Sequence, residues 1–193
     1  MCGRYSLFDD QDNMEIRQII AEVNHQYPDQ PIRTGEIFPT NTVPILTADG
    51  SDLTPKPLVW GFPKYTGSGV IINARAETAE EKKTFRQSLF TSRCIVPSTG
   101  FYEWDEQKRK YLFRLPDEQT LYMAGISKEY DGIQRYVILT TAANDSMKDV
   151  HHRMPVILPR DKLQMWMTNT DASIDYLHSD MPELSRTAQN TAN

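Results

Sequence analysis

The chain has 193 residues, 39% of them hydrophobic, and a net charge of −5 at pH 7 with histidine neutral. This length and composition are typical of a single soluble domain with a substantial core. They exclude a membrane-spanning helix, because no apolar run approaches the ~20 residues that such a helix needs. The N-terminus also lacks the basic-then-apolar pattern of a signal peptide, so we expect a cytoplasmic protein without membrane contact.

The first half of the chain predicts a helix and then several strands. Residues 12–24 form the helix candidate, because four isoleucine and valine side chains recur at i, i+3, i+4 and i+7. Strands are expected at 43–48, 56–62 and 69–75, followed by a helix over 78–91. Basic residues outnumber acidic ones between residues 53 and 115. That imbalance is compatible with one local groove for a phosphate backbone, and equally with ordinary solvated faces.

The second half is rich in predicted strands, expected at 94–96, 100–104, 110–115, 121–126, 136–141 and 155–158. Two short helices are expected at 160–167 and 172–178. The strands follow one another too closely for repeated βαβ units. We therefore expect an α+β fold, with a mostly antiparallel sheet or partly closed β-barrel core and flanking helices. Residues 1–180 would form the single domain and residues 181–193 a loose C-terminal tail.

Cys2 follows Met1 directly. Aminopeptidases remove an initiator methionine when the next residue is small, and removal would leave a free α-amine beside the Cys2 thiol. An α-amine titrates near ~7.7–8.0, so a useful fraction is neutral and nucleophilic at cytoplasmic pH. Such an aminothiol condenses with an aldehyde to a Schiff base and then closes a thiazolidine ring. Taken alone, Cys2 is better explained as an inert residue beside a frayed terminus.

Four short segments combine polar or ionisable residues with Gly, Pro or aromatic residues near the ends of expected strands. They are 1–5 (Met-Cys-Gly-Arg-Tyr), 73–78 (Asn-Ala-Arg-Ala-Glu-Thr), 97–104 (Pro-Ser-Thr-Gly-Phe-Tyr-Glu-Trp) and 151–155 (His-His-Arg-Met-Pro). Each segment alone is a weak signal. Arg75 and Glu77 would have the same spacing in a plain ion pair, and Phe101 and Trp104 fit a hydrophobic core. Cys94, the only other cysteine, fits a small buried hydrophobe.

Together, in this order and with Trp60-Gly61-Phe62-Pro63, the segments resemble the SRAP family of SOS response-associated peptidase-like proteins. The resemblance runs from Met1 to about Leu158. It implies the SRAP fold and binding to single-stranded DNA that contains an abasic site. It also implies a covalent link from the N-terminal cysteine to the open-chain sugar aldehyde, which protects the lesion in the DNA damage (SOS) response. The older family name reflects a proposed autoproteolysis that exposes the cysteine.

The resemblance also implies catalytic roles for four residues. Cys2 would be the nucleophile, using its α-amine for the Schiff base and its sulfur for ring closure. Asn73 would position the cysteine and the sugar, because a neutral amide both donates and accepts hydrogen bonds. Glu103 would be the general acid/base during sugar-ring opening and dehydration of the carbinolamine. His151 would exchange protons with the sugar oxygen and the imine. The position of Arg153-Met154-Pro155 identifies His151, and not His152, as the family histidine.

Six further residues are implied as DNA contacts: Arg4, Asn41, Trp60, Phe62, Arg75 and Arg153. Arg4 and Arg75 match arginines that hold phosphates next to the lesion. Trp60 and Phe62 match a segment that stacks on bases or wedges at a strand junction. The asparagine is a candidate for a DNA backbone contact. The last arginine is expected either to contact phosphate or to brace the site internally.

We expect no cofactor and no metal, because Cys2, Cys94 and His151 lack the paired short spacings of metal ligands. The expected partner is single-stranded DNA with abasic sites, bound by a monomer that is cytoplasmic and nucleoid-associated, or nuclear in a eukaryote. Two other functions stay open. One is a cysteine-type peptidase that processes its own N-terminus with Cys2, Glu103 and His151. The other is a non-covalent reader of single-stranded or modified DNA.

Overall fold

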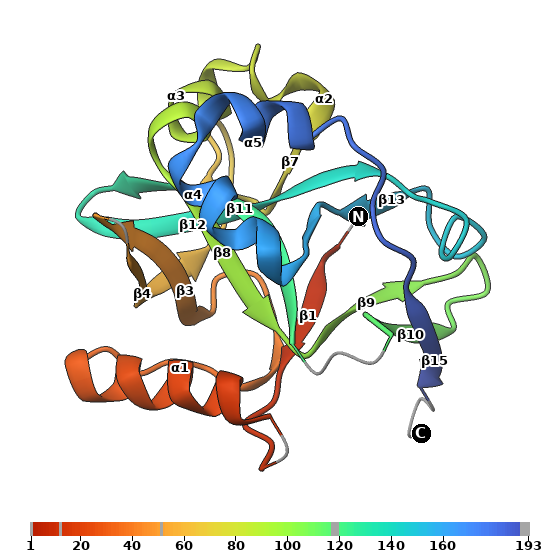
Figure 1. Ribbon diagram of the computed structural model, residues 1–193, viewed down its shortest axis with the longest axis horizontal. Coiled ribbons are helices and arrows are strands. Elements are labelled where there is room, and N and C mark those ends of the chain that lie inside the picture. Colours follow the sequence, from red (N-terminus) through yellow and green to blue (C-terminus); the bar gives the residue numbers. More distant parts are fainter. Residues whose placement is uncertain (1, 12, 51, 117–119, 190–193) are drawn as a thin grey trace.

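A computed structural model describes residues 2–11, 13–50, 52–116 and 120–189 (Figure 1). Within these residues the strands form two large sheets and one small hairpin, with five α-helices packed around them. Most neighbouring strands run antiparallel, and one sheet closes on itself. The α+β fold with a barrel core that the sequence predicts is confirmed. No helix in the described part is both long and apolar enough to span a membrane.

The closed sheet is a barrel of five strands, each paired with the next: β12 (Ile133–Ala142), β4 (Asp52–Trp60), β3 (Thr42–Asp49), β8 (Arg93–Ser98) and β11 (Leu121–Tyr130). Pairing of β11 back to β12 closes the barrel. Only the β4–β12 contact among these is parallel. Every residue of β8 is buried, because one of its faces lines the barrel interior and the other is covered from outside.

The second sheet has the order β15 (Ser185–Gln189), β10 (Lys110–Arg114), β9 (Gly100–Trp104), β1 (Arg4–Leu7) and β2 (Gly35–Ile37), all antiparallel. The chain passes from the barrel into this sheet at Gly100, whose φ is 142°. A Cβ at Gly100 would lie 2.7 Å from the carbonyl oxygen of Phe113, so only glycine fits there. A buried hydrogen bond of 2.7 Å between the Tyr5 and Tyr136 hydroxyls joins the sheet to the barrel.

Helix α1 (Met14–Gln26) forms because its apolar residues lie on one face. Ile16, Ile19, Ile20 and Val23 are the buried residues of that face, as the sequence predicts. The helix begins after Asn13, whose side-chain oxygen accepts a hydrogen bond from the Ile16 amide at 3.0 Å. The apolar face of α1 packs against β3 and β4.

The remaining helices lie on the other side of the barrel (Figure 1): α2 (Ala76–Ala79), α3 (Lys83–Thr91), the 3-10 turn η1 (Arg160–Lys162), α4 (Leu163–Thr168) and α5 (Thr170–Tyr176). Arg93, at the start of β8, ties two of them to the barrel. Its guanidinium donates to the Leu89 carbonyl of α3 at 2.9 Å and to the Trp166 carbonyl of α4 at 2.6 Å. The helix expected over 78–91 is thus two helices, separated by a turn.

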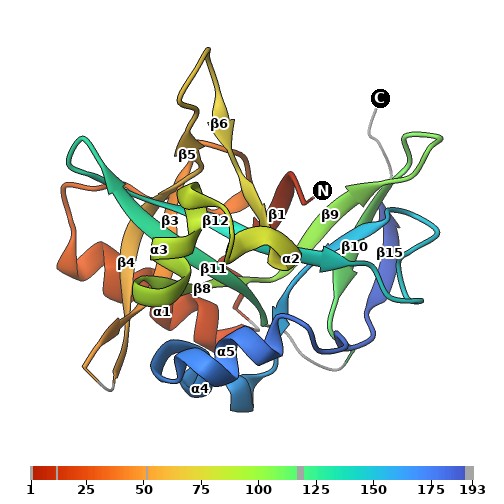
Figure 2. The same cartoon turned by 90° about the horizontal axis from the view of Figure 1, so that it is seen from above.

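The expected strand over 69–75 is also divided, into β6 (Val70–Ile71) and β7 (Asn73–Arg75). β6 pairs with β5 (Phe62–Pro63) in a hairpin that projects from the barrel (Figure 2). Near the C-terminus, residues 185–189 form β15 on the edge of the second sheet. The expectation of a loose tail is therefore wrong for these residues, because their backbone pairs with β10. Residues 190–193 lie outside the described part.

Candidate functional site

Strand β12 brings two of the four sequence segments together. β7 pairs along one flank of β12 in parallel, and β13 (Arg153–Pro155) pairs along the other flank in antiparallel orientation. Thr140 of β12 consequently lies opposite Arg75 on one side and Pro155 on the other. The segment 73–75 and the segment 151–155 therefore flank the same end of one strand.

Cys2 lies directly before β1 and is fully buried. The Asn73 side-chain amide donates a hydrogen bond to the Cys2 carbonyl oxygen at 3.0 Å. The Cys2 thiol points toward the Arg4 carbonyl oxygen, with 3.6 Å between sulfur and oxygen. Asn73 therefore holds the cysteine backbone from the barrel side. This contact brings together the two residues that the resemblance implies as nucleophile and positioning group.

Glu103 is buried in β9, next to the position where Arg4 and Tyr102 pair. Burial first, and the Glu103 carboxylate second, raise the pKa of the Cys2 thiol well above its ordinary value. The thiol is therefore neutral at physiological pH. The Glu103 carboxylate therefore acts electrostatically on the sulfur.

His151 precedes β13, and the backbone of Arg153 fixes its ring. The Arg153 amide donates to His151 Nδ1 at 3.0 Å, and the Arg153 carbonyl oxygen lies 3.1 Å from the same nitrogen. The neighbouring His152 ring stacks on His151 with centroids 4.5 Å apart. The charge of His151 is the main cause that lowers the pKa of His152. When Nδ1 of neutral His151 accepts the hydrogen bond from the Arg153 amide, the imidazole proton is on Nε2.

Arg153 is an internal brace in this structure. Its guanidinium makes two hydrogen bonds to the Glu77 carboxylate, at 2.5 and 2.9 Å, and another to the Thr140 carbonyl oxygen. These hydrogen bonds lower the pKa of Glu77. Of the two roles expected for Arg153, the geometry supports bracing rather than phosphate contact. Glu77 thus pairs with Arg153 and not with Arg75, which is exposed.

Arg4 lies on a partly exposed aromatic surface beside the site. Its guanidinium stacks 4.0 Å from the Phe38 ring centroid and pairs with Glu36 at 3.0 Å. Lys110 also pairs with Glu36, at 2.7 Å, and lies 3.9 Å from the Tyr102 ring centroid. Such alternation of cations and rings is typical of surfaces that bind single-stranded nucleic acid.

Sequence reasoning missed Phe38 and Lys110. Phe38 is 41% exposed, one of several large hydrophobic side chains in the described residues that are open to solvent. Lys110 pairs in register with Trp104, which the sequence analysis expected in the core but which lies half-buried beneath Arg4 and Lys110. The sequence alone does not give the register between β9 and β10, which brings the Lys110 ammonium close to the Tyr102 and Trp104 rings.

Trp60 and Phe62 are not surface residues, and the expectation that they stack on bases is corrected. Both are fully buried. The Trp60 indole donates to the Ile72 carbonyl oxygen at 3.0 Å and packs against Tyr5, and Phe62 packs against Tyr130 with centroids 5.2 Å apart. Their rings build the core beneath the site and have no face to offer a base.

Asn41 has a local structural role. Its side-chain oxygen accepts a hydrogen bond from the Phe38 amide at 3.0 Å, which closes the turn that presents the Phe38 ring. The geometry therefore places Asn41 behind the aromatic surface. In the described part of the chain, no group of three or more His, Cys, Asp or Glu side chains is arranged to hold a metal ion.

Three comparisons with known proteins agree with this architecture. The family described as SOS response associated peptidase (SRAP) matches residues 1–190. The Bacillus subtilis protein named abasic site processing protein YoaM is 36% identical over 93% of this chain and 84% of its own length. The Escherichia coli protein named abasic site processing protein YedK is 28% identical over 86% of this chain and 79% of its own.

Among solved structures, a Bacteroides thetaiotaomicron protein superposes with a TM-score of 0.78, at 26% identity, over 98% of this chain and 93% of its own. A Bordetella bronchiseptica protein gives a TM-score of 0.75 at 24% identity and covers 98% of this chain and 100% of its own. The second likeness concerns the fold alone. With the family match along almost its whole length and with these relatives, the chain belongs to the SRAP family.

Proposed function

We propose that this protein captures abasic sites in single-stranded DNA as a covalent thiazolidine crosslink through Cys2, after removal of Met1. Its relatives are named for abasic site processing, which supports the substrate class. The observation that carries the chemistry is the Cys2 environment. The Asn73 amide holds the Cys2 carbonyl at 3.0 Å, and the Glu103 carboxylate acts on the Cys2 thiol.

The reaction has two bond-forming steps. The α-amine of Cys2 attacks the open-chain aldehyde of the abasic sugar, and loss of one water gives an imine. The thiol then adds across the C=N bond, so that a carbon–sulfur bond forms and the thiol proton ends on the ring nitrogen. Holding amine, thiol and aldehyde together makes the ring closure effectively intramolecular. No oxidant, metal or cofactor enters this balance.

Glu103 and His151 serve as the proton-transfer groups of this proposal. Glu103 accepts the thiol proton during ring closure and protonates the departing hydroxide of the carbinolamine. His151, held at Nδ1 by the Arg153 backbone, uses Nε2 to exchange protons with the sugar oxygen. Asn73 is the positioning group, since its amide contacts the cysteine backbone rather than the sulfur.

DNA binding is proposed on the partly exposed cations and rings beside the site. Arg4 and Arg75 neutralise phosphates on either side of the lesion, while Phe38 and Trp104 supply stacking surfaces. Such contacts are independent of base sequence and weaken with salt, because they release counterions from the DNA backbone. This assignment replaces the two buried aromatic residues implied by the resemblance.

The raised pKa of the Cys2 thiol favours this proposal over the peptidase alternative. A cysteine peptidase needs a thiolate nucleophile, usually with its pKa lowered by a nearby cation. At Cys2, burial and the Glu103 carboxylate raise the pKa of the thiol instead. In the proposed reaction the amine makes the first bond, so a neutral thiol does not hinder it.

The test incubates protein confirmed by mass to begin at Cys2 with an oligonucleotide carrying one abasic site. We expect a heat-stable adduct on a denaturing gel without borohydride, with the mass of protein plus DNA minus one water. Protein that retains Met1 should bind the oligonucleotide but form no adduct, because its Cys2 nitrogen is an amide.

No adduct from protein that begins at Cys2 would refute the crosslinking proposal. Cleavage of Met1 by the purified protein, without an aminopeptidase, would instead support the peptidase. Binding that is equal for native and Cys2→Ala protein, together with no adduct, would support the non-covalent reader.

A further inference from the structure

The C-terminal segment crosses the loop that leads to His151. Residues 181–189, here called the C-terminal strap, follow α5 in the chain and descend to the edge strand β15 (Figure 1). On the way they pass residues 143–152, which connect β12 to β13 and carry the histidine. Met181 and Leu184 are buried and anchor the strap. The Met181 sulfur also accepts a hydrogen bond from the Ile157 amide at 3.2 Å.

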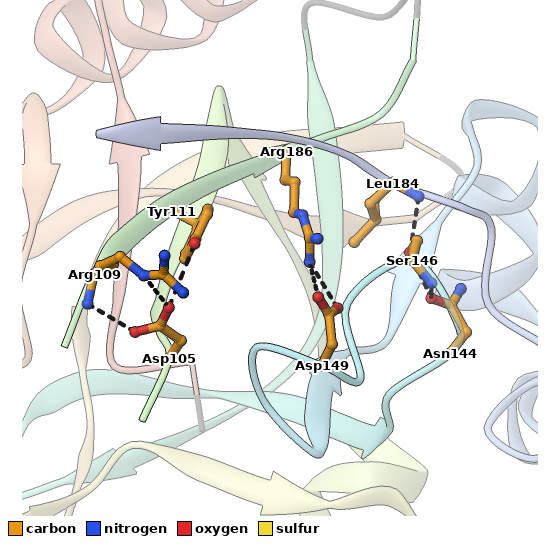
Figure 3. A network of polar contacts seen from close by, with 8 residues as sticks. All are labelled: Asp105, Arg109, Tyr111, Asn144, Ser146, Asp149, Leu184 and Arg186. Carbon is orange, nitrogen blue, oxygen red and sulfur yellow. Dashed lines mark hydrogen bonds and ion pairs between the residues drawn. The ribbon is translucent and has the colours of Figure 1, made fainter. Parts of the chain in front are cut away.

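Three loop residues make polar contacts with the strap, and two of them are Asn144 and Ser146. The Asn144 amide donates to the carbonyl oxygens of Met181 and Pro182, both at 3.0 Å. The Leu184 amide donates to the Ser146 hydroxyl at 3.1 Å, and that hydroxyl donates to the Asn144 side-chain oxygen (Figure 3). Asn144 is therefore the hub of the junction.

The third loop residue, Asp149, makes an ion pair with the strap. Arg186 pairs with both Asp149 oxygens, at 2.6 and 2.7 Å (Figure 3). Both side chains are more than a third exposed, so the pair contributes little to overall stability. Its bidentate geometry instead restricts where the loop can lie relative to the strap.

A short relay connects the hub to the histidine. The Asn144 carbonyl oxygen accepts hydrogen bonds from the Met147 and Lys148 amides, at 3.2 and 3.0 Å. The Met147 carbonyl oxygen in turn accepts from the His151 amide at 3.0 Å. Met147 is fully buried, which makes this relay stiff. A shift of Asn144 therefore moves the backbone that sets the His151 ring.

We propose that the C-terminal strap positions His151 for proton transfer, with Asn144 as the positioning residue that couples the two. The inference rests on the proposed function of His151. The proposal gives a role to the specific contacts between the strap and the loop, which the pairing of β15 with β10 does not require. Small displacements matter here, because a misplacement of ~1 Å can lower a rate about 100-fold.

The test is a double-mutant cycle on the rate of crosslink formation by protein that begins at Cys2. His151→Ala should lower this rate about 100-fold, as expected for loss of a general acid–base group. Asn144→Ala should lower it about tenfold in the native background but cause no further loss with His151→Ala, because it acts through the histidine. An equal loss in both backgrounds would show a merely structural role and overturn the inference.

Milder variants keep the test usable if Asn144→Ala does not fold. Ser146→Ala and Arg186→Gln should each lower the rate two- to fivefold, on the order of one displaced hydrogen bond, again only when His151 is present. Arg17→Gln is the control, since Arg17 of α1 forms an exposed ion pair with Asp9 at 3.4 Å, and this helix lies apart from the strap (Figure 1). It should leave the rate unchanged.

A second readout does not depend on crosslinking. Nitrogen-15 NMR of histidine side chains in Met1-retaining protein reports the hydrogen bond at His151 Nδ1. We expect Asn144→Ala and Ser146→Ala to shift the His151 signals and Arg17→Gln to leave them in place. Unchanged His151 signals in folded Asn144→Ala protein would overturn the inference. Shifted signals together with full activity of His151→Ala would refute the proposed role of the histidine but not the positioning.

Discussion

The surroundings of the two cysteines show how one residue type is put to two uses. Cys94 lies in β8 inside the barrel and Cys2 lies before β1 beneath the second sheet, and both are fully buried. The pKa of each thiol is raised. Burial is the only cause at Cys94, whereas at Cys2 burial is followed by the Glu103 carboxylate.

Burial alone therefore does not distinguish a reactive cysteine from an inert one in this molecule. Around Cys94 the packing is tight, because a Cβ at Gly125 would lie 2.9 Å from its sulfur. The ionisable groups on which Cys94 acts are the Tyr5 and Tyr136 phenols, and no carboxylate of the described residues contributes to its thiol pKa. At Cys2 the Asn73 amide contacts the backbone and the Glu103 carboxylate acts on the thiol. Polar groups aimed at a buried cysteine are costly unless they have partners or a function.

Replacing each cysteine gives the sharpest contrast and the largest expected effect. In protein that begins at residue 2, Cys2→Ser should abolish the heat-stable adduct, because the amine still forms an imine but no sulfur closes the ring. Cys94→Ala should crosslink at the native rate and lose about 1 kcal/mol of unfolding free energy from the small cavity. Denaturing gels and urea titrations measure the two effects, and a crosslinking defect in Cys94→Ala would remove the distinction.

Neutralising Glu103 is expected to have the next largest effect. Glu103→Gln should slow crosslinking about 100-fold or more, since it removes a general acid–base group. It should also lower the Cys2 thiol pKa, because the carboxylate disfavours the thiolate, although burial keeps that pKa above its ordinary value. The rate of alkylation against pH, followed for each cysteine by mass spectrometry, should change for Cys2 and not for Cys94. An unchanged Cys2 profile would contradict the assigned electrostatics.

The brace behind the site should matter for stability more than any exposed ion pair. Arg153→Met removes hydrogen bonds from a guanidinium that is only 10% exposed and should cost about 2 kcal/mol of unfolding free energy. The cost is below that of a fully buried pair, because the Glu77 side chain is 44% exposed. Arg17→Gln, which breaks an exposed pair with Asp9 at 3.4 Å, should cost less than about 1 kcal/mol. Urea denaturation of both variants makes the comparison, and equal losses would show that Arg153 is not a brace.

The smallest expected effect is the loss of the stabilisation by the Arg153–Glu77 pair at low pH. Hydrogen bonds from Arg153 lower the pKa of Glu77, so the folded state favours its charged form. That stabilisation is complete above the ordinary glutamate value of ~4.3 and is lost as pH falls through the lowered folded pKa. The stability gap between native protein and Glu77→Gln should therefore shrink as pH drops from about 6 to about 3. A gap that stays constant in urea titrations would contradict this linkage.

Periodicity located the elements with a strongly apolar face. The i, i+3, i+4, i+7 pattern found α1, and runs of β-branched and aromatic residues found the barrel strands. Strands β1, β2 and β15 were missed. The last of these has mostly exposed residues and exists because its backbone pairs with β10, which residue type alone does not reveal.

The functional site likewise has residues that the sequence pattern identifies and residues that only the tertiary structure reveals. The order of the four segments was enough to name Cys2, Asn73, Glu103 and His151 as candidates. The two aromatic residues chosen for base stacking were wrong as surface groups, because exposure depends on what covers a ring. Phe38, which the sequence did not single out, is exposed by the turn that Asn41 closes.

The sequence by itself determined the family, the α+β class and the chemistry that its residues offer, because these follow from residue types and their order. The tertiary structure alone decided which groups meet. Pairing of β7 and β13 with β12 joined two distant segments, the register of β9 and β10 set cations over rings, and the strap reached the His151 loop. Long-range contacts of this kind depend on strand register and chain path, which local residue patterns do not encode.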